Sequence, residues 1–274
     1  MDGMGDKSGP CWQPLPWLRV PFLAFLALGV LGGISPRGAE LVPFRGIDAE
    51  DAYQLRPLAV PEAPARDSAV DPNVEAEFKA GALAMGRGDL RAATKTFREV
   101  LSRQPQHLGC LINLGWIAQR EKNWGDAEFF LKRAQNIAPD NTSVWLALGL
   151  VYLEQERIDF ALAAFSQVVA LDPSNARAHR MLGLTLGRKE WYSAAEGELR
   201  RSLEIEPNDP GAHFNLAVVY LQRHPVALEL ARRHYHISLD LGSAPDAKVA
   251  AMLESAKSSA ADLKAVSVGR QVSR

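Results

Sequence analysis

The stretch that decides the fold is WLALGLVYLEQERIDFALAAF, which runs from Trp145 to Phe165. Four of its residues stand at offsets of three, four and seven, which return to one face of a helix: Trp145, Leu148, Gly149 and Tyr152. Gly149 is unexpected there, because glycine inside a helix costs about 1 kcal/mol relative to alanine. We therefore expect a second element to approach this face too closely for a Cβ atom.

Three rows of residues recur along the chain with a step of 34 positions. They are the glycine row Gly81, Gly115, Gly149 and Gly183, the alanine row Ala93, Ala127, Ala161 and Ala195, and the proline row Pro105, Pro139, Pro173 and Pro207. A repeat of this length indicates a solenoid of helical hairpins. The first helix of each unit would bear the glycine and the second helix the alanine. The proline would then end the second helix, because it has no N–H to donate.

The complete pattern, Trp145…Leu148-Gly149…Tyr152…Ala161…Phe165…Pro173, resembles the signature of the tetratricopeptide repeat at every position. The resemblance covers about Val74 to Gly242. It implies an all-α, right-handed superhelical solenoid of about five helix-turn-helix repeats. The predicted array spans 74–243, with units near 74–107, 108–141, 142–175, 176–209 and 210–243.

The fifth unit departs from the pattern. Ala217 stands in place of the glycine, and Ala231 follows Ala195 by 36 residues instead of 34. We therefore expect a longer turn near His224-Pro225. The segment 244–264 contains an amphipathic stretch, which predicts a C-terminal capping helix over the open end of the stack.

The segment 1–39 predicts a signal peptide or an N-terminal membrane anchor. Residues 21–34, PFLAFLALGVLGGI, carry no charge and follow Lys7 and Arg19. Fourteen residues are short for a span of about 20 and fit the apolar region of a secretory signal. The small-x-small cleavage site is poor, so a cleaved signal, an anchor through residues 17–34 and a cytosolic protein with an apolar tail all remain open. We expect export, to the periplasm or to a membrane-anchored place in the cell envelope.

The remaining segments predict a linker and a tail, and the composition argues against several kinds of partner and site. Residues 40–73 contain five prolines without helical periodicity, which predicts a semi-extended linker, and 265–274 predict a disordered tail. A net charge of −1 implies no strongly basic surface, which argues against nucleic acid as a partner. Cys11 and Cys110 form neither a disulfide framework nor a metal-binding spacing. We expect Cys110 to be a small buried or half-buried residue.

No motif of catalysis is present. The sequence has no nucleophile elbow and no phosphate-binding glycine loop, so we predict a protein that is not an enzyme and has no cofactor. His234 and His236 resemble a metal pair, but residues two apart on a helix point in opposite directions, so we predict no metal site. Asn141-Thr142-Ser143 matches a glycosylation acceptor, yet Asn141 immediately before a helix is the expected capping residue.

The tetratricopeptide resemblance implies that the first helices line a concave groove for a partner peptide. The residues predicted to face this groove are Phe78, Ile112, Trp116, Gln119, Leu146, Leu150, Leu153, Arg177, Arg180, Leu184, Arg188 and Phe214. This row is apolar in units one to three and basic in unit four. Family members that bind a terminal carboxylate use lysine and asparagine rows, which here hold Phe78, Ile112, Ala82 and Trp116. The sequence therefore argues against a carboxylate clamp.

Three explanations of the apolar rows remain open. The side chains could be ordinary core between repeats, or they could bind a partner segment with apolar anchors and an acidic end. They could also hold part of the linker, through Leu41-Val42-Pro43-Phe44 or Leu55-Arg56-Pro57-Leu58. We predict a non-enzymatic protein-interaction scaffold. The alternatives are an accessory or assembly subunit of an envelope machine (secretion, pilus or cytochrome assembly) and an enzyme of unrecognised type.

Overall fold

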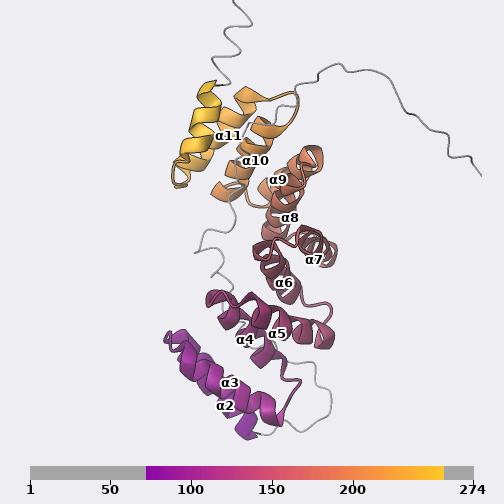
Figure 1. Ribbon diagram of the computed structural model, residues 1–274, viewed down its shortest axis with the longest axis vertical. Coiled ribbons are helices and arrows are strands. Elements are labelled where there is room, and N and C mark those ends of the chain that lie inside the picture. The colour runs from indigo at the N-terminus through magenta and orange to yellow at the C-terminus, as the bar shows by residue number, and fades with distance from the viewer. Residues whose placement is uncertain (1–71, 256–274) are drawn as a thin grey trace, which may run out of the picture. The chain divides into compact units, whose positions relative to one another are not determined.

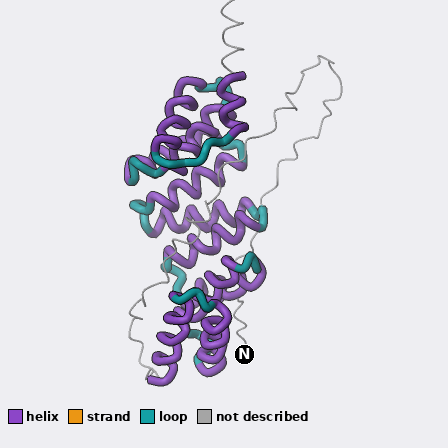
Figure 2. The backbone as a smooth tube through the Cα atoms, turned by 90° about the vertical axis from the view of Figure 1, so that its left-hand side faces the viewer, coloured by secondary structure: helices purple, strands orange, loops and turns teal. Residues whose placement is uncertain are grey.

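The computed structural model describes residues 72–255, and these residues contain helices and turns but no strand. The predicted signal or anchor, almost all of the linker, the end of the capping segment and the tail lie outside the described residues. Figure 1 shows the described helices as successive pairs along the chain, and Figure 2 shows the short loops that join them.

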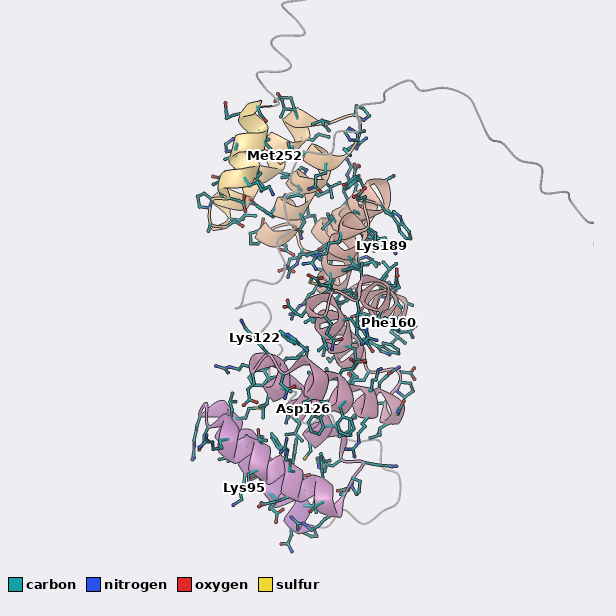
Figure 3. All side chains as sticks on the ribbon, viewed as in Figure 1. Lys95, Lys122, Asp126, Phe160, Lys189 and Met252 are labelled. Carbon is teal, nitrogen blue, oxygen red and sulfur yellow. The ribbon has the colours of Figure 1, made fainter. Side chains whose placement is uncertain are left out.

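The helices form five hairpins. They are α2 (Pro72–Gly86) with α3 (Leu90–Arg103), α4 (Leu108–Arg120) with α5 (Trp124–Ile137), α6 (Thr142–Glu154) with α7 (Ile158–Leu171), α8 (Ala176–Arg188) with α9 (Tyr192–Ile205), and α10 (Pro210–Gln222) with α11 (Leu228–Asp240). Each helix packs on its hairpin partner, and successive hairpins pack on one another. A further helical stretch at 247–255, marked by Met252 in Figure 3, buries Val249 and Leu253. The prediction of an all-α solenoid of five helix-turn-helix units followed by a C-terminal helix is confirmed.

The glycine row marks the close crossing of the two helices in each of the first four hairpins. A Cβ atom at Gly81 would lie 2.6 Å from the Phe97 ring, and one at Gly183 would lie 2.7 Å from Leu199 Cγ. These contacts are too short for any real side chain. The predicted close crossing is confirmed. In each hairpin, the space that a Cβ of the glycine would need is filled by a side chain of the second helix, four residues after the small alanine. These side chains are Phe97, Leu131, Phe165 and Leu199.

The turns within the first four hairpins share one conformation. Each has three residues, and the middle residue is left-handed, with φ of 82° at Gly88, 57° at Lys122, 58° at Glu156 and 61° at Glu190. The residue after the left-handed one donates its backbone N–H to the carbonyl oxygen five residues before it, as Arg157 N does to Tyr152 O at 2.8 Å. The fifth turn, residues 223–227, has five residues, which confirms the predicted longer turn.

The position of Trp145 recurs at 34-residue steps as Glu77, Leu111, His179 and His213, and we call these residues the tryptophan row. The joints between hairpins explain why several of them are polar. Trp145 Nε1 donates to Pro139 O at 2.6 Å, and the His179 Nε2 lies 3.1 Å from Pro173 O. His213 repeats this contact with Pro207 O at 3.1 Å. In the second unit, where the row holds leucine, Arg133 Nη2 donates to Pro105 O instead, at 2.6 Å. In units three to five, the row therefore binds a carbonyl oxygen of the preceding joint in addition to filling space. Asn141 caps α6 by accepting from Val144 N, as predicted.

Candidate protein-binding face

The candidate site is the row of side chains on α2, α4, α6, α8 and α10 that the sequence assigns to the groove. We call this row the first-helix face. Eight of its twelve predicted members are buried in the structure: Phe78, Ile112, Leu146, Leu150, Leu153, Arg180, Leu184 and Phe214. Trp116, Gln119 and Arg177 are half-buried, and Arg188 is exposed.

Several of these side chains join neighbouring units. The Phe78 ring lies 4.7 Å from the ring of His107, and Gly109 leaves room for it, since a Cβ there would lie 2.7 Å from Phe78 Cζ. Gln119 Nε2 donates to Ala147 O at 2.9 Å and so links α4 to α6. These contacts support the explanation that part of the first-helix face is core between repeats.

Arg180 is a structural bridge between the fourth and fifth units. Its side chain is almost fully buried, and its Nε lies 2.9 Å from Asp209 Oδ2. Asp209 also caps α10, because its Oδ1 accepts from the backbone N–H of Gly211 at 2.8 Å. A Cβ at Gly211 would lie 2.7 Å from Arg180 Nη1, so the glycine makes space for the guanidinium. The sequence indicated only that Arg180 makes the fourth unit basic, whereas the structure places it inside a joint.

Trp116 is the largest apolar side chain of the face that keeps some exposure. It packs at the edge of the core of the first two units, and the Arg120 guanidinium carbon lies 5.5 Å from the centre of its ring. A half-buried aromatic ring is a suitable anchor point for a partner's apolar residue.

Charge is unevenly divided between the first and second helices. Apart from Glu154, the four helices α4, α6, α8 and α10 contain no acidic residue, and their basic residues are Arg120, Arg177, Arg180 and Arg188. The second helices carry acidic residues, for example Glu128 on α5 and Glu196 on α9. The first-helix face from unit two onward is therefore apolar with positive charge. A ligand that matches it needs apolar anchors and acidic groups.

Two carboxylate networks, which sequence reasoning missed, connect second helices to the following hairpin. Glu128 lies 2.7 Å from Lys132 Nζ and 2.8 Å from Arg157 Nη1, and it accepts from Gln155. Burial raises the pKa of Glu128, but these donors outweigh it, so the pKa lies below its ordinary value. Burial raises the pKa of Tyr152 beside them.

The second network repeats the first at the equivalent position two units further along. Glu196 lies 2.8 Å from Arg200 Nη2 and 2.7 Å from Arg223 Nη1, and Tyr220 Oη donates to its Oε1 at 3.0 Å. The spacing of Glu128 and Glu196, and of Tyr152 and Tyr220, was the sequence signal that could have revealed this two-unit period. With their oxygens engaged in this way, these carboxylates stabilise joints and are poorly placed for catalysis.

The structure brings His213 and His234 together. Their Nδ1 atoms lie 2.8 Å apart, and the rings are stacked with centroids 5.1 Å apart. Burial, followed by the charge of His213, lowers the pKa of His234 to about 4. Among the described residues no three metal-ligating side chains form a group.

Cys110 is buried as expected, and burial together with Glu75 raises the pKa of its thiol to about 12.

The comparisons with known proteins agree on the fold. One family model, the Cilia and flagella-associated protein 70 middle TPR-like domain, matches residues 48–172, and a second, the tetratricopeptide repeat, matches residues 146–210. The chain is a tetratricopeptide repeat protein. Within residues 72–255 no helix is both long enough and apolar enough to cross a membrane.

Solved structures with this fold include MamA from Desulfovibrio magneticus RS-1, which is 18% identical, has a TM-score of 0.59, and covers 63% of this chain and 97% of its own. YrrB, described as a TPR protein with an unusual peptide-binding site, is 18% identical with a TM-score of 0.55, over 66% of this chain and 90% of its own. At such identities the likeness shows the fold alone.

Curated relatives match over a small part of their length. The protein O-mannosyl-transferase Tmtc3 of Drosophila melanogaster is 27% identical over 53% of this chain, which is 16% of that protein. The BBSome complex member BBS4 homolog of the same organism is 21% identical over 46% of this chain and 33% of its own length. This tetratricopeptide repeat protein thus spans a third or less of these relatives.

Proposed function

We propose that this tetratricopeptide repeat protein is a scaffold of the cell envelope that binds a segment of a partner protein on its first-helix face. One observation carries the proposal: the first helices from unit two onward combine apolar side chains with Arg120, Arg177 and Arg188 and almost no acidic residue. Such a surface fits a peptide with an apolar anchor and a nearby Asp or Glu.

The relatives support a binding role. The BBS4 homolog and the anaphase-promoting complex subunit 3 of fission yeast are named as members of multi-subunit complexes, and YrrB is described by its peptide-binding site. The half-buried Trp116 and Gln119 supply the accessible apolar and polar contacts in unit two. Arg177 and Arg188 supply positive charge two units further along.

The envelope location rests on the sequence of residues 17–34. An uncharged apolar run behind Arg19 is typical of an exported chain. Cell fractionation of a tagged protein with and without residues 1–39 tests it. We expect the complete chain in the envelope fraction and the shortened chain in the cytosol, and finding both in the cytosol would refute export.

The binding face is tested with Trp116→Ala against a matched control. A pull-down from solubilised envelope with mass spectrometry identifies the partner, and kinetic binding then compares the variants. Loss of a partly buried aromatic anchor should weaken binding more than about tenfold, mainly through faster dissociation. Trp191→Ala is the control, because Trp191 is 53% exposed at the N-cap of α9 and is not a member of the first-helix face.

Circular dichroism establishes that both tryptophan variants fold. If folded Trp116→Ala binds as the parent does, the first-helix face is not the binding site. Arg177→Glu with Arg188→Glu should slow association, most clearly at low salt, because exposed charges steer the encounter. Arg180 is left unchanged in this test, since its ion pair with Asp209 is part of the fold.

A further inference from the structure

Helix α8 is buried around its whole circumference. Seven consecutive residues, 181–187, are buried, and because each residue turns the helix by about 100°, these seven point in every direction. The described helices that pack closely on α8 are α7, α9 and α10. A neighbouring helix of equal diameter shields about 60° of the circumference of α8, so three such neighbours cover about half of it. Something else must bury the side chains on the remaining half.

The first helices next to α8 are buried in the same way, whereas those of the first two units are less buried. Residues 146–153 of α6 and residues 212–221 of α10 are buried without interruption. In α2 and α4, by contrast, Ala82, Trp116 and Gln119 on the first-helix face remain half-buried. The side chains that need a cover are therefore those of units three to five.

We propose that residues 41–58 of the same chain occupy the first-helix face of α6, α8 and α10, so that the scaffold holds its own segment until a partner displaces it. The segment reads LVPFRGIDAEDAYQLRPL. It has the chemistry that this face selects, with apolar anchors at Leu41, Phe44 and Ile47. Three acidic residues follow the anchors, namely Asp48, Glu50 and Asp51, and they outnumber the two basic residues of the segment, Arg45 and Arg56.

The backbone of the segment and its distance from α2 also fit. Pro43 and Pro57 favour an extended chain, a form in which peptides are commonly held at sheet edges and in aromatic-lined grooves. Position 58 stands fourteen positions before Pro72, where α2 begins, and this length of chain can span roughly 45–50 Å. Stacked helices lie about 10 Å apart, which places α8 roughly 30 Å from α2 along the row of first helices.

The other end of the chain does not have this chemistry. Residues 256–274 carry Lys257, Lys264, Arg270 and Arg274 against the single acidic Asp262. A positive segment would meet Arg177 and Arg188 of α8, and like charges oppose such docking. The N-terminal segment is thus the part of the chain that fits.

Site-specific cross-linking in the full chain tests the proposal. A photoreactive benzophenone amino acid replaces Phe44, the protein is irradiated in dilute solution, and the products are mapped by mass spectrometry. We expect a product of monomer size in which residue 44 is joined to peptides of α6, α8 or α10. The same amino acid at Phe129, which is 56% exposed on α5, is the control and should not reach these helices.

Each other outcome overturns the proposal. A product of dimer size would mean that a second copy occupies the face. Cross-links from residue 44 that never reach α6, α8 or α10 would mean that the segment lies elsewhere.

Hydrogen exchange gives a second readout that needs no partner. Phe44→Asp with Ile47→Asp removes the apolar anchors, and we expect the amides of α8 to exchange at least about tenfold faster. Val266→Asp with Val268→Asp places the same charges in the C-terminal segment and should leave α8 unchanged. Equal exchange of α8 in the first variant and the parent would contradict the proposal.

The inference rests on the proposed function only in using the same face, and the two can fail separately. If Trp116→Ala weakens partner binding but no intramolecular cross-link forms, the scaffold role stands and self-occupancy is wrong. If the cross-link forms while Trp116→Ala binds normally, the face holds its own segment and the partner binds elsewhere.

Discussion

The fourth and fifth units both hold a histidine at the same position of their first helix, but the two histidines contact different side chains of the second helix. His179 and His213 occupy equivalent positions of these two units, and in each the Nε2 lies 3.1 Å from the carbonyl oxygen of the proline at the preceding joint. The Nδ1 of His179 lies 2.7 Å from Glu198 Oε2. The Nδ1 of His213 instead lies 2.8 Å from His234 Nδ1.

The difference comes from the turn. Glu198 stands 19 residues after its histidine, and His234 stands 21 residues after its own, because the fifth turn has two extra residues. The repeat period therefore fixes where each first helix places its side chain, while the turn length decides which side chain of the second helix meets it. A histidine that faces a carboxylate in one unit faces another histidine in the next.

The largest expected effect concerns the crossing of the two helices. Gly183→Leu should destabilise the array by about 3 kcal/mol or more, because a Cβ there meets Leu199 Cγ at 2.7 Å and the backbone Ala195 O at 3.1 Å. The equivalent position of the fifth unit already holds Ala217, so the fifth unit should not share this intolerance. The denaturant midpoint measures the loss.

Gly197→Leu is the matched control for this change. Gly197 lies in α9, and a Cβ there has no neighbour within 4 Å, so the substitution should stabilise by roughly 0.5–1 kcal/mol through helix propensity. Similar midpoints for Gly183→Leu and the parent would disprove the close-crossing account.

The second expected effect concerns the joint between the two units. Asp209→Asn keeps an oxygen that can cap α10 but removes the charge opposite the buried Arg180, so we expect a loss of about 2–3 kcal/mol. Asn175→Ala removes the cap of α8, in the unit before, and a longer hydrogen bond to Asp172, but no buried charge, and should cost about 1 kcal/mol. Thermal unfolding of both variants compares the two. Equal losses would show that the buried ion pair adds nothing to the cap.

The smallest expected effect is the response to acid. The pKa of His234 is about 4 in the fold and near 6.5 when unfolded, so the unfolded state binds the proton first as the pH falls. Its contribution to stability is complete above about pH 6.5 and is lost toward pH 4. After discounting for solvent screening of a half-buried ring, the loss is on the order of 1–2 kcal/mol.

His234→Gln isolates this contribution, because all other titrating groups are shared with the parent. The difference in denaturant midpoint between the two proteins should shrink as the pH is lowered from 7 to 4.5. A constant difference would mean that the histidine pair does not sense acid.

The sequence predicted the hairpins well because their signals are local. Glycine at the crossing, proline at each joint and the two extra residues before Ala231 each act within one unit, and the structure confirms all three. The sequence missed contacts between units, such as Arg180 with Asp209, and the meeting of His213 with His234. Those contacts depend on how helices stack in space, which the repeat pattern does not encode.

The first-helix face shows the same division between what the sequence predicted and what only the stacking of units decided. The sequence placed Phe78, Leu146 and Phe214 on one row of the first helices, because the repeat period returns each to the same place. The structure shows that these three are buried, while Trp116 keeps some exposure. Burial is set by neighbours from other units, so the pattern within one helix could not separate core from surface.

By itself, the sequence determined the number of units, the position of every close crossing and the lengthened fifth turn, since these follow from residues a few positions apart along one hairpin. Only the tertiary structure decided that the tryptophan row binds joint carbonyls, that Arg180 bridges two units and that two histidines meet. The physical reason is that a hydrogen bond or an ion pair needs two groups within about 3 Å, and the stacking of successive helices sets which groups come that close.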